Sequence, residues 1–161
     1  MQTEFDHQWL RRSFELAIEA RQRGDHPFGA VLVAAGGELL AEGGNLVVSR
    51  GDFSAHAELA LLQAAWLDLG PSALAGACLY SSCEPCPMCA GAAHWSGLGR
   101  VVFGLRVGRL YELMGAAGQG AALMVECRQL LAQSGRPIEV LGPQLHSEAE
   151  RVHAGFWASG A

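Results

Sequence analysis

The stretch SSCEPCPMCAGAAHW, residues 81–95, holds three of the five cysteines in a chain of 161 residues. Cys83, Cys86 and Cys89 lie close together, and two prolines separate them. Such a group can form a disulfide, a redox-active dithiol or a metal site. The odd cysteine count, and an N-terminus without the features of a signal peptide, argue against a disulfide framework. The choice between the other two depends on residues elsewhere in the chain.

The composition narrows the class of protein. Half of the residues are apolar and 17% are charged, which predicts one compact α/β domain over residues 1–161. The eleven basic residues are all arginine, which excludes a Schiff-base lysine and a lysine-bearing phosphate loop. A formal net charge of −5 argues against nucleic acid as a partner. No apolar run is long enough for a membrane span, and the expected location is cytoplasmic.

The hydrophobic spacing predicts helices alternating with strands, and therefore a layered sheet with a largely parallel second half. The expected helices are 7–23 with Asp6 as cap, 55–70 with Ser54 as cap, a segment from Pro85 or Cys86 to near Ser96, 125–135 and 147–159. The expected strands are 30–35, 38–42, 77–82, 100–105 and 137–142, the first two forming a hairpin around Gly36-Gly37. The pair Gly43-Gly44 predicts a bulge or a close backbone approach. Residues 109–123 fit one helical turn followed by a mobile glycine-rich loop.

Two of the expected helices bring potential metal ligands together. If the strands around residues 55–96 are parallel neighbours, both helices pack on one sheet face with their N-termini side by side. His56 then lies in the first turn of one helix, and Cys86 and Cys89 lie in the first turn of the other. Helix N-termini favour thiolate over thiol. One histidine and two thiolates form a three-ligand zinc set whose open fourth position is typical of a catalytic site.

Glu58 follows His56 by two residues and is not needed as a ligand. It can move a proton of the water whose pKa zinc lowers towards ~7. A redox pair would leave both His56 and Glu58 unexplained. A structural zinc would need a fourth protein ligand, for which Cys83 is the candidate, although a buried packing role suits Cys83 better.

The HAE motif at 56–58 and the PCPMC motif at 85–89 resemble the cytidine deaminase superfamily of zinc-dependent deaminases. The longer string SCEPCPMCAGAAHW, with PFGAVLV at 27–33, resembles its guanine deaminase and tRNA adenosine deaminase branch, and the similarity covers residues 27–105. The resemblance implies a three-layer α/β/α fold with a five-stranded mixed sheet. It also implies one zinc ion per subunit, a homodimer, and hydrolytic deamination with Glu58 as the proton-transfer residue.

The same resemblance implies substrate contacts, and most of these have a plainer interpretation. Phe28 matches a residue that can stack on a ring, and Trp95 matches a residue that lines the base pocket. Asn45 matches a substrate-binding asparagine, and the backbone of Ala57 is expected to hydrogen-bond the substrate. The plainer interpretations are a core position for Trp95 and a turn position for Asn45.

The later part of the chain departs from the guanine deaminases. Those enzymes place an acidic substrate contact in the region of residues 104–120, where Glu112 is the candidate replacement and a solvated helical turn is the alternative. Phe156 and Trp157 are expected to close the pocket of their own or a partner subunit, or else to anchor the last helix.

The aromatic residues and the acidic charge favour a small heterocyclic amine as substrate, with guanine as the first choice. The departure at residues 104–120 leaves guanosine, cytosine and an amino-triazine as alternatives. A tRNA adenosine deaminase and a catalytically idle, zinc-binding partner of another deaminase are two further alternatives. The intact Glu58 argues against the idle partner.

Overall fold

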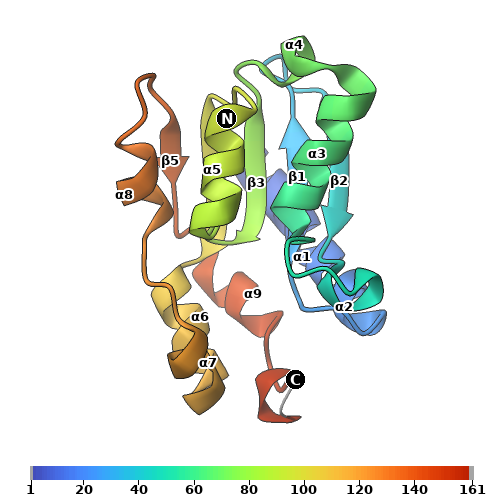
Figure 1. Cartoon of the computed structure of the whole chain (residues 1–161), viewed down its shortest axis with the longest axis vertical. Helices are drawn as coiled ribbons and strands as arrows, with labels where there is room; N and C mark the ends of the chain where they lie inside the picture. Colours follow the sequence, from blue (N-terminus) through green and yellow to red (C-terminus); the bar gives the residue numbers. More distant parts are fainter. Residues whose placement is uncertain (1, 160–161) are drawn as a thin grey trace.

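The computed structural model describes the backbone of residues 2–159 and, except at residues 117, 121 and 159, their side chains. Its centre is one five-stranded sheet with the strand order β2-β1-β3-β4-β5 (Figure 1). The strands are β1 (Gly29–Val33), β2 (Leu39–Gly44), β3 (Cys78–Cys83), β4 (Arg100–Leu105) and β5 (Glu139–Leu141). β1 runs antiparallel to both of its neighbours, whereas β3, β4 and β5 are parallel. The mixed sheet and its parallel second half confirm the prediction from the sequence.

Helices lie on both faces of this sheet. They are α1 (Gln2–Gln22), α2 (Val47–Arg50), α3 (Ala57–Leu69), α4 (Pro71–Leu74), α5 (Pro87–Trp95), α6 (Val107–Met114), α7 (Ala116–Ala121), α8 (Cys127–Leu131) and α9 (His146–Arg151), followed by the 3-10 turn η1 (Trp157–Ser159). Among the helices of residues 2–159, none has the length and apolar character that a transmembrane span requires.

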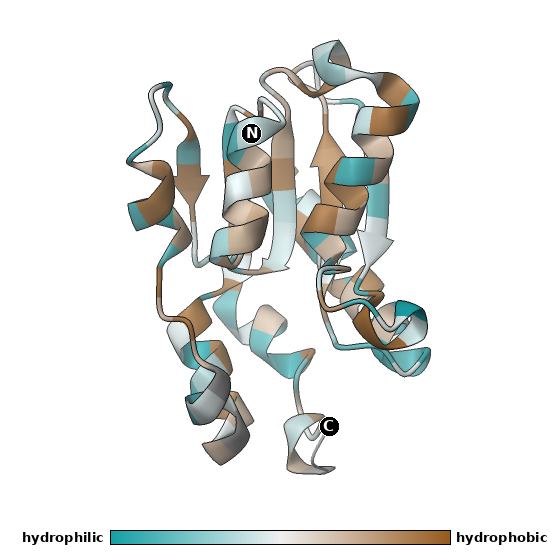
Figure 2. Cartoon of the chain, viewed as in Figure 1, coloured by the Kyte–Doolittle hydropathy of each residue, from teal (hydrophilic) through white to brown (hydrophobic). Residues whose placement is uncertain are grey.

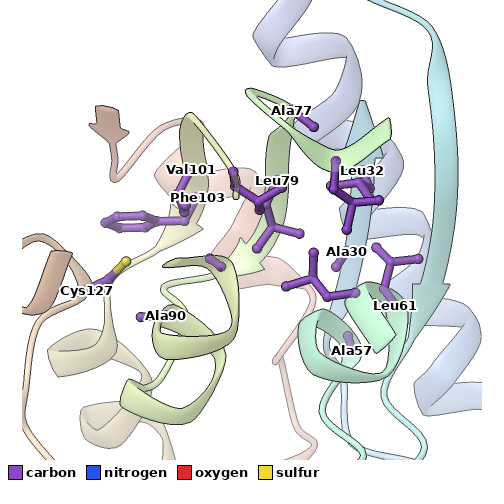
Figure 3. Close-up of a cluster of buried hydrophobic side chains, with 14 of the residues drawn as sticks. Ala30, Leu32, Ala57, Leu61, Ala77, Leu79, Ala90, Val101, Phe103 and Cys127 are labelled. Carbon is purple, nitrogen blue, oxygen red and sulfur yellow. The ribbon is translucent and has the colours of Figure 1, made fainter. Parts of the chain in front are cut away.

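The central strands β1, β3 and β4 bury both of their faces, which makes the three-layer arrangement. Successive side chains of a strand point to opposite faces. Leu32 and Leu79 pack with side chains of α3 and α5 (Figure 3), while Val31 and Tyr80 pack with side chains of α1 on the other side. All five residues of β1 are buried, and the strand is mostly brown in the hydropathy colouring (Figure 2). The α3–α5 face carries the functional residues described below.

The first helix corrects one prediction. Asp6 does not cap it, because α1 begins at Gln2 and Asp6 lies inside its second turn, 4% exposed. The carboxylate instead accepts hydrogen bonds from Arg100 Nη1 at 2.6 Å and Nη2 at 2.8 Å, and from Tyr80 Oη at 2.8 Å. Asp6 therefore links α1 to the first halves of β3 and β4.

The second half of the chain corrects another prediction. The expected glycine-rich loop is helical: α6 and α7 follow each other and are separated at Gly115, whose φ of 62° lies in the region that glycine tolerates best. The expected closing helix is interrupted, because α9 ends at Arg151 and Gly155 adopts a φ of 72° before η1 begins. This interruption lets the C-terminal segment turn towards the functional site.

The glycine pair at the end of β2 gives the expected close approach. A Cβ atom on Gly44 would lie 2.9 Å from Ala20 Cβ and 3.0 Å from the carbonyl oxygen of Leu16. Glycine at this position therefore lets β2 approach α1 closely. The irregular pairing of the hairpin lies elsewhere, between Leu32 and Val33.

Candidate metal centre and active site

Three potential metal ligands meet where α3 and α5 begin. His56 is the N-cap residue of α3, Cys86 is the N-cap residue of α5, and Cys89 lies in the first turn of α5. The Nδ1 atom of His56 lies 3.6 Å from Cys86 Sγ and 3.7 Å from Cys89 Sγ. The three ligand atoms lie within 4.8 Å of one another. The meeting of two helix starts on one sheet face confirms the prediction, but the predicted cap of the first helix is wrong, because His56 and not Ser54 is the N-cap residue of α3.

The spacing of these atoms fits zinc. Zn–N bonds near 2.0–2.1 Å and Zn–S bonds near 2.3 Å at tetrahedral angles place N and S about 3.6 Å apart, close to the observed separations. Two thiolates and one imidazole are also a zinc-preferring donor set. Cys83 is buried but is not part of this group of three. Three protein ligands leave the fourth position available, as in catalytic zinc sites.

The pKa values of the two cysteines of the group are shifted in opposite directions. A hydrogen bond from Cys89, together with the nearby imidazole of His56, lowers the pKa of Cys86 to about 4. The hydrogen bond to Cys86 and strong burial raise the pKa of Cys89 above its ordinary value. Zinc binds cysteine as thiolate, so metal binding displaces the proton of Cys89.

Glu58 lies beside the ligands on the first turn of α3. Its side chain is buried, and burial raises the pKa of its carboxyl group. Ser81 Oγ donates a hydrogen bond to Oε1 at 2.8 Å, while Oε2 lies 3.6 Å from Cys89 Sγ. The carboxylate is thus held in one orientation against the metal site.

A cavity of about 270 Å³ opens next to these groups. Polar and ionisable side chains in its wall come from His26, Asn45, His56, Glu58, Cys83, Glu84 and Cys86. Apolar and aromatic side chains complete the wall, namely Phe28, Val107, Leu110, Tyr111, Met114 and Trp157. A pocket with mostly apolar walls and a few placed polar groups is the usual form of a small-molecule site.

The structure places the predicted substrate contacts in two groups. Phe28, Asn45 and Trp157 line the cavity. Ala57 is buried beside it as the first residue of α3, a position whose N–H group has no partner within the helix. Phe156 lies one residue from the wall, and its ring meets that of His26 edge-on at 6.3 Å.

Two of the predicted contacts lie outside this cavity. Trp95 is 81% exposed and lines a separate apolar groove with Trp66 and Leu67. Glu112 is exposed and pairs with Arg109, with N–O at 2.9 Å. Neither side chain lines this cavity in the part of the chain that the structure describes.

The wall formed by α6 was not expected as a unit. The sequence pattern did not predict that Val107, Leu110, Tyr111 and Met114 line the cavity. Their spacing of three and four residues places them on one helix face, a signal that becomes readable once residues 107–114 are known to be helical. Glu84 was not predicted as a cavity residue either, because no local sequence pattern indicates that position.

The C-terminal segment closes one side of the cavity. The indole of Trp157 stacks on His153, with ring planes 14° apart, and Trp157 Nε1 lies 3.3 Å from His153 Nδ1. The ring of Phe28 lies 5.5 Å from that of His153. Burial lowers the pKa of His153 to about 4, so the imidazole is neutral at pH 7 and accepts the indole hydrogen bond.

Comparison with known proteins agrees with this geometry. Residues 3–105 match the family model of the cytidine and deoxycytidylate deaminase zinc-binding region. A probable cytosine deaminase of Schizosaccharomyces pombe is 37% identical over 98% of this chain and 96% of its own length. A tRNA-specific adenosine deaminase of Haemophilus influenzae is 39% identical over 65% of this chain and 60% of its own. The solved structure of a guanine deaminase from Nitrosomonas europaea superimposes with a TM-score of 0.77 at 26% identity, covering 93% of this chain and 83% of that one.

The family match includes His56, Glu58, Cys86 and Cys89, and it spans well over half of the chain. The protein therefore belongs to the cytidine and deoxycytidylate deaminase family of zinc-dependent hydrolases.

Proposed function

We propose that this protein hydrolytically deaminates a small free nucleobase, with cytosine the first substrate to test and guanine the second. The observation that carries the proposal is the meeting of the metal ligands and Glu58 in the wall of one aromatic-lined cavity of about 270 Å³. The overall reaction consumes one water, replaces a ring C–NH2 group by C=O, and releases ammonia.

Glu58 is the proton carrier in this proposal. It takes one proton from the attacking water and delivers it to a ring nitrogen. It then takes the remaining proton from the added hydroxyl group, as the C=O bond forms, and delivers it to the departing amine, which leaves as ammonia. Zinc bound by the three ligands supplies the Lewis acidity that makes water nucleophilic near neutral pH. Because Cys89 as a zinc ligand is a thiolate and cannot donate, Oε2 of Glu58 becomes free while Ser81 holds Oε1.

The remaining polar groups suit a ring that carries a carbonyl oxygen. Asn45 Oδ1 already accepts a hydrogen bond from Val47 N at 3.0 Å, so Asn45 offers its amide N–H groups to a ligand. The N–H group of Ala57, which has no partner within its helix, is a second donor. Phe28 and Trp157 offer aromatic faces to a planar ring.

Cytosine is placed before guanine for two reasons. Glu112, the candidate for the acidic contact of guanine deaminases, lies outside the cavity and pairs with Arg109. A relative that matches nearly the full length of both chains is a probable cytosine deaminase. Guanine remains the second candidate, because a guanine deaminase is similar in structure over 93% of this chain. Guanosine and an amino-triazine follow as further candidates.

Deamination of adenosine in tRNA is the competing function, since one relative is a tRNA-specific adenosine deaminase. A net charge of −5 works against binding a phosphate backbone. Trp157 also forms part of the wall of the cavity, whose volume is only about 270 Å³. Both features favour the free base.

We further propose that residues 1–161 act as one domain and that two copies associate in the cytoplasm. The exposed side chains of Trp66, Leu67 and Trp95 border one apolar groove, and exposed patches of this kind mark protein contacts. Five free cysteines suit a reducing compartment. Sedimentation at micromolar concentration tests the association, and a Trp95→Glu variant that sediments like the wild type would argue against this groove as the interface.

Ammonia release from zinc-loaded protein tests the function directly. The substrates are cytosine, guanine, guanosine, adenosine, an amino-triazine and a tRNA anticodon stem-loop, each compared with a Glu58→Gln variant. We expect turnover of a free base and a fall in kcat of about 10²–10⁴ in the variant, the usual worth of general acid–base catalysis, with unchanged zinc content. Turnover of the stem-loop alone, or a variant as fast as the wild type, would refute the proposal.

A further inference from the structure

Glu84 is a buried carboxylate that the deamination chemistry does not use. It follows the last residue of β3, is 8% exposed and lines the active-site cavity. Both of its oxygens are engaged by the protein itself. Oε2 accepts a hydrogen bond from Val107 N at 2.9 Å, and Oε1 accepts one from Cys127 N at 2.9 Å.

The two donors occupy equivalent positions in their helices. Val107 is the first residue of α6, and Cys127 is the first residue of α8. N–H groups in a first helical turn have no partner inside the helix. The preceding residues, Arg106 and Glu126, do not cap these helices with their side chains. One carboxylate therefore caps two helix N-termini, where a negative charge is favourable.

The helix held in this way is a wall of the cavity. Val107, Leu110 and Tyr111 of α6 all line it. The backbone N–H of Glu84 also donates to the carbonyl oxygen of Leu105 at 2.7 Å, at the end of β4. Only one residue separates Glu84 from the ligand Cys86. A single residue thus connects the metal-binding loop (residues 84–86, between β3 and α5) to the part of the cavity wall that α6 forms.

We propose that Glu84 is a positioning residue, which holds α6 against the metal-binding loop and thereby sets the affinity for the substrate ring. Loss of this carboxylate loosens α6, so that the ring is bound less tightly. Turnover of bound substrate changes little, because Glu58 and the three metal ligands stay in place. The kinetic part of this inference rests on the proposed function, whereas the structural part does not.

Two variants remove the connection from opposite sides. Glu84→Gln keeps the shape of the side chain but sets an amide N–H2 group against one of the two backbone donors. Val107→Pro leaves Glu84 unchanged and removes its donor on α6. Proline is favoured at the first helical position, and the preceding residue already has the extended conformation, φ −73° and ψ 150°, that proline requires. Glu126→Gln is the matched control, since it makes the same charge change on an exposed residue at the start of α8.

Hydrogen exchange of the zinc-loaded proteins gives a readout that needs no substrate. In both variants we expect faster exchange in peptides covering residues 107–114 and unchanged exchange in peptides covering residues 57–69. A general loss of stability would raise exchange in both regions, and would overturn the inference. Unchanged exchange at residues 107–114 in both variants would overturn it as well.

Steady-state kinetics with cytosine or guanine give the second readout. We expect KM to rise about tenfold in Glu84→Gln and Val107→Pro, the effect of one lost charge-assisted hydrogen bond, with kcat within about twofold of the wild type. The Glu126→Gln control keeps both constants. A fall in kcat at unchanged KM would instead make Glu84 part of the chemistry. If wild-type protein turns over no base, the proposed function fails, and the exchange experiment still decides the role of Glu84.

Discussion

Replacing Asp6 by asparagine should destabilise the fold without affecting the active site. The Asp6 carboxylate, 6% exposed as a side chain, receives two hydrogen bonds from Arg100 and one from Tyr80. These contacts lie where β3 and β4 begin, whereas Cys86 and Cys89 lie beyond the other end of β3. The variant keeps the shape of the side chain and removes its charge.

The structure sets the size of the effect. Removing one partner of a buried ion pair costs about 3–5 kcal/mol. Here Arg100 keeps a second partner, Glu139, with Nε–Oε2 at 2.6 Å, and its side chain is 16% exposed to water. The introduced amide oxygen also keeps the hydrogen bond from Tyr80. We therefore expect a loss of about 2–3 kcal/mol, which corresponds to a fall in Tm of about 4–12 °C for a chain of this size.

The pH dependence of this loss identifies its origin. Burial opposes ionisation, but hydrogen bonds from Arg100 and Tyr80 outweigh it and hold the pKa of Asp6 below its usual 3.8. A group whose pKa is depressed by folding contributes stability that is complete above the unfolded pKa and is lost as pH falls through the folded pKa. The difference between wild type and Asp6→Asn should thus be constant from pH 7 to about 5 and shrink below 3.8.

Urea unfolding at several pH values, with equal zinc loading, measures this difference. Tyr80→Phe is the matched control, because it removes one hydrogen bond to Asp6 but keeps the ion pair, and should cost about 1 kcal/mol. Zinc content and kcat should not change in either variant. A loss below about 0.5 kcal/mol in Asp6→Asn, or a loss that stays the same at low pH, would refute the reasoning.

Three further predictions follow from other parts of the structure. Gly29→Ala places a Cβ atom against the backbone of α1, 2.6 Å from Ala17 N, and should lower the free energy of unfolding in urea by about 2–3 kcal/mol. Gly91→Ala on α5 is the control, because an added Cβ atom there meets no atom of another part of the chain within 4 Å. This variant should be neutral or stabilising by about 0.5 kcal/mol. Burial lowers the pKa of His153 from 6.5 to about 4, so acidification between these values should weaken docking of the C-terminal segment, because only the detached segment gains a proton. The fluorescence of Trp157 should shift to longer wavelength over this range, and a His153→Phe variant should lose the shift. Removal of zinc by a strong chelator should abolish ammonia release and lower Tm, zinc should restore both, and magnesium should restore neither.

The chemistry of the site was more predictable from the sequence than its shape. His56, Cys86 and Cys89 belong to short motifs whose local structure, a helix start, follows from the residues themselves. Both helices pack on one sheet face because the strands that precede and follow each of them run parallel. Those two facts are enough to bring the three ligand atoms together.

The shape of the cavity depends on contacts between distant segments, which local patterns do not report. Asp6 reads as a cap because its partner, Arg100, is far away in the sequence. Glu84 bonds to backbone groups of Val107 and Cys127, and backbone groups carry no sequence signal. Trp95 shares a motif with the metal ligands, yet its side chain points to a different groove.

The reacting groups and part of the cavity wall come from different elements of the chain, and this separation has an evolutionary consequence. The metal ligands and Glu58 come from the starts of α3 and α5, while another part of the cavity wall comes from α6 and Trp157. Substitutions on α6 can reshape the space offered to a ring without passing through the reacting groups. The substrate specificity of this scaffold can therefore change from one amino-heterocycle to another through substitution of a few side chains on a single short helix.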